Sequence, residues 1–114
     1  MNNLSNMWDF PVMDGVTFVN ANRVHPLMQA RVQKLIQHME YDMNVRKLVL
    51  FGSSLEFRCD SLSDIDIYVE KYDKDKKLEF FPDLDCEVDI VSNLEPESRL
   101  YKEIDKTGLL LFER

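Results

Sequence analysis

The stretch LVLFGSSLEFRCDSLSDIDIYVE, residues 48–70, decides how this chain folds. It holds two apolar runs separated by a polar segment, and the first run ends at the pair Gly52-Ser53. The second run carries two aspartates, Asp64 and Asp66, one residue apart. Charged side chains are costly inside a buried strand unless something pairs with them. The two carboxylates therefore need a chemical explanation.

Alternation along the second run places both aspartates on one face of a strand. Side chains at positions i and i+2 share a face, so Asp64 and Asp66 point one way while Ile65 and Ile67 point toward a core. Neighbouring carboxylates repel each other unless a proton, a basic side chain or a divalent cation relieves the repulsion. Ligand sets made only of oxygen suit Mg²⁺, so we predict that both aspartates are magnesium ligands.

A third carboxylate is expected from another strand, LDCEVDIV, residues 84–91. Asp85, Glu87 and Asp89 alternate onto one face there, and Asp89 is flanked by apolar residues on both sides. We therefore choose Asp89 as the third metal ligand and catalytic carboxylate. Three convergent carboxylates can hold two Mg²⁺ ions about 3.5–4 Å apart, which favours in-line displacement at phosphorus.

The glycine turn fits the same chemistry. Gly52 lets the backbone pass close to a phosphate, and N–H groups at the start of a following helix attract anions. We predict that Gly52, Ser53 and Ser54 bind the phosphates of a nucleoside triphosphate, with the Ser53 hydroxyl donating to a phosphate oxygen. Each of these signals is weak alone, because exposed strands often carry two acids, but their conjunction is far more specific.

The rest of the chain predicts an α/β domain, also described as α+β, with a small mixed sheet flanked by helices. Pro26 starts an amphipathic helix ending near 41–44, whose apolar stripe includes Met43. The predicted strands are 47–51, 65–70, 87–91 and 109–112. A short helix capped by Ser53 or Ser54 runs to about Arg58. A second helix runs from Pro96 to Gly108, with Leu100 and Ile104 on one face.

The first 24 residues form an extension of low regularity before a domain at 25–114. Thr17–Val19 is a candidate short strand within it, and Trp8 and Phe10 could pack on the body or an interface. His25 is expected to start the helix that follows. The two cysteines, Cys59 and Cys86, have neither a metal-binding spacing nor a disulfide framework.

Composition narrows the functional classes. The chain has 114 residues, enough for one ordinary domain, and a formal net charge of −7. That charge repels nucleic-acid backbones, so polynucleotide binding is not expected. No apolar stretch approaches the roughly 20 residues that span a bilayer, and no secretory signal is seen, so we expect no membrane association and a cytoplasmic location.

At this point the motif set FGSS…SDIDIYVE…EVDIV resembles the nucleotidyltransferase fold of the DNA polymerase β superfamily. That family carries Gly-Ser, a ten-residue spacer, Asp-x-Asp and a later single Asp, and the spacer here runs from Ser54 to Ser63. The small size and the ending YKEIDKTGLLLFER are similar to the minimal nucleotidyltransferases (MNT) of bacteria and archaea. The likeness covers residues 26–114.

The resemblance implies transfer of a nucleoside monophosphate, usually AMP from ATP, to a hydroxyl, with release of pyrophosphate. Gly52 and Ser53 would correspond to the family's nucleotide-phosphate turn, and Asp64, Asp66 and Asp89 to its metal ligands. In many minimal members the acceptor is a tyrosine on a partner HEPN-domain toxin, so the MNT protein acts as an antitoxin.

Two alternatives stay open. The chain could be a binding module of the same fold that masks a partner without catalysis, since Arg58 is the only base in the loop after Gly52-Ser53. It could also be an antibiotic nucleotidyltransferase, although those relatives usually carry an added helical domain for the acceptor. The sequence leaves the acceptor, the nucleotide and any homo-oligomer undetermined.

Overall fold

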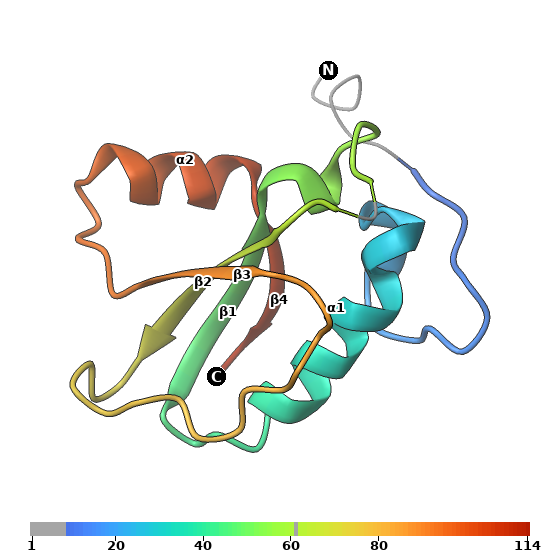
Figure 1. The fold of residues 1–114 in the computed structure, drawn as a ribbon. Helices are drawn as coiled ribbons and strands as arrows, with labels where there is room; N and C mark the ends of the chain where they lie inside the picture. The colour runs from blue at the N-terminus through green and yellow to red at the C-terminus, as the bar shows by residue number, and fades with distance from the viewer. Residues whose placement is uncertain (1–8, 61) are drawn as a thin grey trace.

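The computed structural model describes residues 9–60 and 62–114 and shows the α+β architecture that the sequence predicts (Figure 1). A four-stranded mixed sheet packs against two α-helices. The elements are, in chain order, η2 (Ala21–Arg23), α1 (Pro26–Met39), β1 (Val45–Phe51), η3 (Gly52–Leu55), β2 (Ile65–Lys71), β3 (Val88–Ser92), α2 (Arg99–Thr107) and β4 (Leu109–Glu113). Among the described residues, no helix is long and apolar enough to cross a membrane.

The strand order β3-β2-β1-β4 brings the predicted site segments to one edge of the sheet. β1 is antiparallel to both β2 and β4, whereas β2 and β3 are parallel. Phe51, the last residue of β1, pairs with Asp66, and Asp66 pairs with Asp89 in the next strand. The end of β1 and the starts of β2 and β3 therefore lie side by side.

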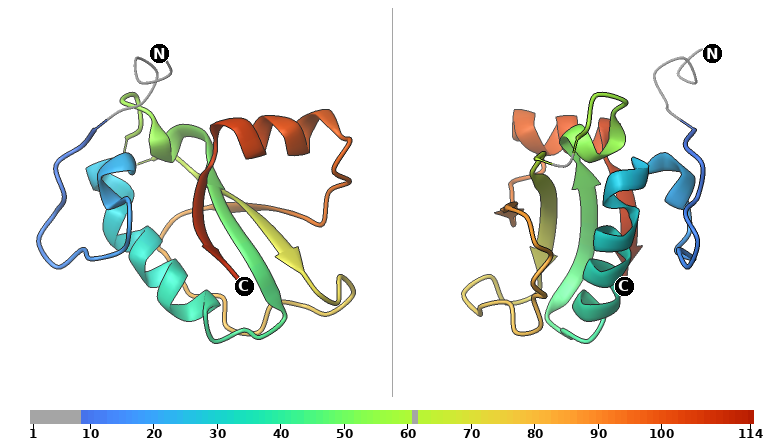
Figure 2. Two further views of the ribbon diagram at one scale, coloured as in Figure 1. Left: turned by 180° about the vertical axis from the view of Figure 1, so that it is seen from behind. Right: turned by 45° about the vertical axis from the view of Figure 1, so that its right-hand side comes forward.

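The larger core lies between the sheet and α1, and Figure 2 shows this helix flanking the strands in two further views. Ile65 and Ile67 are fully buried there, as the alternation predicted. The apolar stripe of α1 meets them. Its buried members are Met28, Val32, Leu35, Ile36 and Met39.

A smaller core covers the opposite face under α2. This core consists of Val49, Tyr68 and Ile104. The ring of Tyr101 packs edge to face on the ring of Tyr68, with the ring centroids 5.7 Å apart. Leu100 and Ile104 lie one turn apart on α2, but Leu100 is 45% exposed, so Ile104 is the member of this pair that enters the core. The helix starts at Arg99, three residues later than predicted, since the Ser98 hydroxyl accepts a hydrogen bond from the amide of Tyr101 and caps it there.

The first helix ends earlier than predicted. α1 stops at Met39, and Met43 is 72% exposed instead of continuing the apolar stripe. Just after the helix, the buried carboxylate of Asp42 accepts hydrogen bonds from the amides of Asn44 and Glu79. These bonds redirect the backbone into β1.

Thr17–Val19 is not a strand. The amide of Thr17 donates to Oε1 of Gln33 on α1, and not to a neighbouring strand. Val19 is exposed, so this segment also lacks the buried alternating side chains that a strand would bring. Trp8 lies outside the described residues, while Phe10 is buried.

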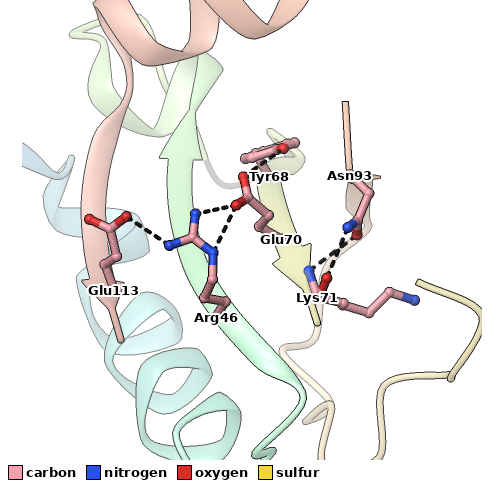
Figure 3. A network of polar contacts seen from close by, with 6 residues as sticks. All are labelled: Arg46, Tyr68, Glu70, Lys71, Asn93 and Glu113. Carbon is pink, nitrogen blue, oxygen red and sulfur yellow. Dashed lines mark hydrogen bonds and ion pairs between the residues drawn. The ribbon is translucent and has the colours of Figure 1, made fainter. Parts of the chain in front are cut away.

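A polar network ties the strands at the end of the sheet away from the glycine turn (Figure 3). The guanidinium of Arg46 on β1 donates to Glu70 on β2 and to Glu113 on β4, and the Tyr68 hydroxyl donates to the other Glu70 oxygen. Burial alone would raise the pKa of Glu70, but these hydrogen bonds outweigh it and lower the pKa. These hydrogen bonds thus join β1, β2 and β4 in one network.

Candidate functional site

Asp66 and Asp89 form the centre of the candidate site. They occupy directly opposite positions on the parallel strands β2 and β3. Asp66 is half-buried and Asp89 is exposed. Burial raises the pKa of Asp66. The charge of Asp89, a hydrogen bond between the two carboxyl groups and the charge of Asp64 raise this pKa further. The two carboxylates are therefore close enough to compete for one proton.

Asp64 stands just before β2 and is exposed. Its charge reaches Asp66, so it belongs to the same acidic edge, but the pairing of Asp66 with Asp89 is the closer one. Within 9–60 and 62–114, no group of three or more His, Cys, Asp or Glu side chains is placed to hold a metal ion. The structure thus brings two of the three predicted ligands together and leaves Asp64 beside them.

Gly52 packs directly against the carboxylate of Asp66. Its φ of +81° lies in the left-handed region that side chains disfavour. A Cβ atom placed there would overlap Oδ2 of Asp66 and lie 3.2 Å from its Cγ. Only glycine lets the turn after β1 reach this carboxylate, so the turn and the acidic pair form one unit.

The turn itself is shorter than predicted. It is a single turn of 3-10 helix, Gly52–Leu55, without a serine cap, and Glu56 is already extended. The prediction of a capped helix to Arg58 was therefore wrong. Such 3-10 turns commonly serve as short connectors, and this one carries the chain from β1 toward the adjacent antiparallel β2.

The two serines of the turn differ in exposure. Ser53 is half-buried, whereas Ser54 is 0% exposed. Oγ of Ser54 has no hydrogen-bond partner among the described residues. The carbonyl oxygen of Ser54 accepts a hydrogen bond of 2.8 Å from the amide of His25. Ser53 is thus the serine whose hydroxyl a phosphate could reach, while Ser54 joins the turn to the start of α1.

Arg58 is the basic residue that follows the turn in the sequence. Nε of Arg58 lies 2.7 Å from Oε1 of Glu56, and the Arg58 side chain is 80% exposed. Part of its charge is therefore already neutralised, although a surface pair this exposed breaks readily.

Sequence reasoning did not find the contact between His25 and Ser54. His25 was expected only to begin the helix, which it does: its Nδ1 accepts from the amide of Leu27. The bond to Ser54 joins residues 29 positions apart, and no local pattern signals such a contact.

The comparison with protein-family models matches residues 33–114 to the family described as polymerase beta, nucleotidyltransferase. The match covers well over half of the chain, so the chain belongs to this family. No curated protein and no solved structure gave a significant match.

Proposed function

We propose that this nucleotidyltransferase-family chain transfers a nucleoside monophosphate, AMP from ATP, to an acceptor hydroxyl on a partner protein. The partner we propose is a HEPN-type toxin, with the chain as its antitoxin. The family supports the general activity. The observation that supports catalysis by this chain is the Asp66–Asp89 pair, set against a glycine that leaves no room for a side chain.

The donor set fits magnesium. Two carboxylates on adjacent strands repel each other. Burial and this repulsion together raise the pKa of Asp66. A hard cation bound by oxygen ligands would relieve it. Asp66 and Asp89 would hold Mg²⁺ with Asp64 beside them, and two bound ions would stabilise the charge that develops at the α-phosphorus.

The chain's own residues would position the reactants. The backbone of Gly52 and Ser53 would cradle the triphosphate, since the turn lacks a side chain on the Asp66 side. The acceptor oxygen forms a bond to the α-phosphorus while the bond to pyrophosphate breaks. The hydroxyl proton passes to one of the carboxylates at this site.

Calorimetric titration of the full chain with ATP, with and without Mg²⁺, tests this proposal. We expect binding that depends on the metal in the wild type and is lost in Asp66→Asn. Asp85→Asn is the matched control: it removes the same charge from an exposed residue of the β3 approach whose φ of 58° asparagine tolerates. Metal-independent binding, or equal binding by Asp66→Asn and wild type, would overturn the proposal.

A masking role without catalysis is the second candidate. It is favoured by the pairing of Arg58 with Glu56 and by the lack of a three-ligand metal group within the described residues. This candidate predicts no metal-dependent nucleotide binding at all in the same titration, with partner binding unchanged in Asp66→Asn.

A further inference from the structure

Residues 9–24, which we call the strap, run alongside α1 (Figure 1). Two glutamines one turn apart on α1 hold it. The side chain of Gln29, fully buried, accepts from the amide of Met13 and donates to the carbonyl oxygens of Pro11 and Val24. Gln33 accepts from the amide of Thr17 and donates to the carbonyl of Gly15. The strap is therefore a fixed part of the domain.

The strap ends at the N-cap of α1. The buried ring of Phe10 packs against the His25 ring at a centroid distance of 5.2 Å, and the amide of Phe10 donates to the carbonyl of Asn22. The backbone bond between Phe10 and Asn22 restrains the chain just before His25 without using the His25 side chain. The amide of His25 in turn donates to the carbonyl of Ser54.

We propose that His25 is a positioning residue for the phosphate turn and that the strap holds it in place. The proposal rests on the proposed function, because it assigns the strap to the same site. Gly52 lacks a Cβ, which leaves its backbone wide conformational freedom, and the hydroxyl of Ser54 has no described partner to anchor it. The bond from His25 fixes the far end of this short turn, and so the distance of Gly52 and Ser53 from Asp66.

Backbone geometry permits a direct test, because proline fits at position 25. His25 has φ of −55°, close to that of proline, and Val24 has the extended φ and ψ that a residue before proline needs. His25→Pro removes the amide hydrogen that Ser54 accepts, and its ring obliges the carbonyl to move away. His25→Ala keeps that amide but loses the imidazole cap, and His25→Asn keeps both the amide and a capping acceptor.

We expect His25→Asn to bind Mg²⁺-ATP like the wild type, and His25→Ala to lose stability while keeping its nucleotide affinity. His25→Pro should bind at least about fivefold more weakly than His25→Ala, the effect of one lost hydrogen bond. Equal affinities of the Pro and Ala variants, with both folded by circular dichroism, would overturn the proposal.

Hydrogen exchange supplies a readout that does not depend on activity. The amide of Glu56 donates to the carbonyl of Ser53 within the turn. Its exchange should quicken in His25→Pro more than in His25→Ala, and equal exchange would contradict the positioning role. If the wild type binds no nucleotide but this difference is seen, the proposed function fails while the structural coupling stands.

Discussion

Replacing Gly52 by alanine separates the two reasons for glycine in the turn. The first is backbone strain, because a residue with a side chain at φ +81° costs about 1–2 kcal/mol. The second is steric, because the new Cβ would overlap Oδ2 of Asp66 and force that side chain to move. The carboxylate is the far end of a rotatable side chain, so it can swing away without unfolding the protein.

Gly15→Ala is the matched control. Gly15 has φ of +85°, nearly the same strain, but a Cβ there would meet nothing within 4 Å. Gly15→Ala should therefore lose about 1–2 kcal/mol of unfolding free energy, measured by urea denaturation, and Gly52→Ala should lose at least as much because it also displaces Asp66. The strain term cancels in the comparison, which leaves the contact with Asp66.

The second assay is calorimetric titration with Mg²⁺-ATP. Gly15→Ala should bind like the wild type, because the added Cβ meets nothing within 4 Å and the strap contacts the His25 ring through Phe10 and not through Gly15. Gly52→Ala should bind at least about tenfold more weakly, since a displaced metal ligand or ligand partner commonly costs 10- to 100-fold in affinity. If Gly52→Ala kept wild-type affinity while losing the same stability as Gly15→Ala, the contact between turn and carboxylate would have no functional role.

Three further outcomes follow from the same structure. Because the folded state raises the pKa of Asp66, its ionised form costs stability at neutral pH, so Asp66→Asn should raise the melting temperature at pH 7 and have little effect below about pH 4. The pKa of Glu70 is lowered, so its contribution is present at neutral pH and lost on acidification; Glu70→Gln should cost about 1–3 kcal/mol at pH 7 and flatten the acid limb of a denaturation profile. Ile67→Ala, at a fully buried position under α1, should cost about 2–5 kcal/mol by chemical denaturation without changing nucleotide binding.

Local periodicity predicted the strands and the burial of Ile65 and Ile67, because alternation and helical spacing are set within a few residues. It located the ends of helices less well. The ends of α1 and α2 depend on the polar side chains of Asp42 and Ser98, whose hydrogen bonds compete with continued helix. Apolar spacing alone does not reveal which polar residue will stop the helix.

The candidate site was predictable in composition but not in arrangement. The alternating patterns indicated that Asp66 and Asp89 lie on two different strands, and the structure pairs the two residues across the neighbouring strands β2 and β3. Spacing could not show that Ser54 is buried or that its carbonyl meets the amide of His25, because both follow from tertiary packing. Residues 9–24 had no recognisable period for a related reason: their partners are glutamine side chains on α1.

Unfavourable polar groups gather at the end of the sheet next to the glycine turn, and this supports a functional purpose for that end. That end combines a pair of like charges with a buried hydroxyl of Ser54 that has no described partner, and each of these lowers stability. The opposite end holds Arg46 and Glu70 in a satisfied network. Packing alone would favour removing both costs, as uncharged or apolar substitutions could. The pair of like charges is what a site needs if a bound cation supplies the missing counter-charge.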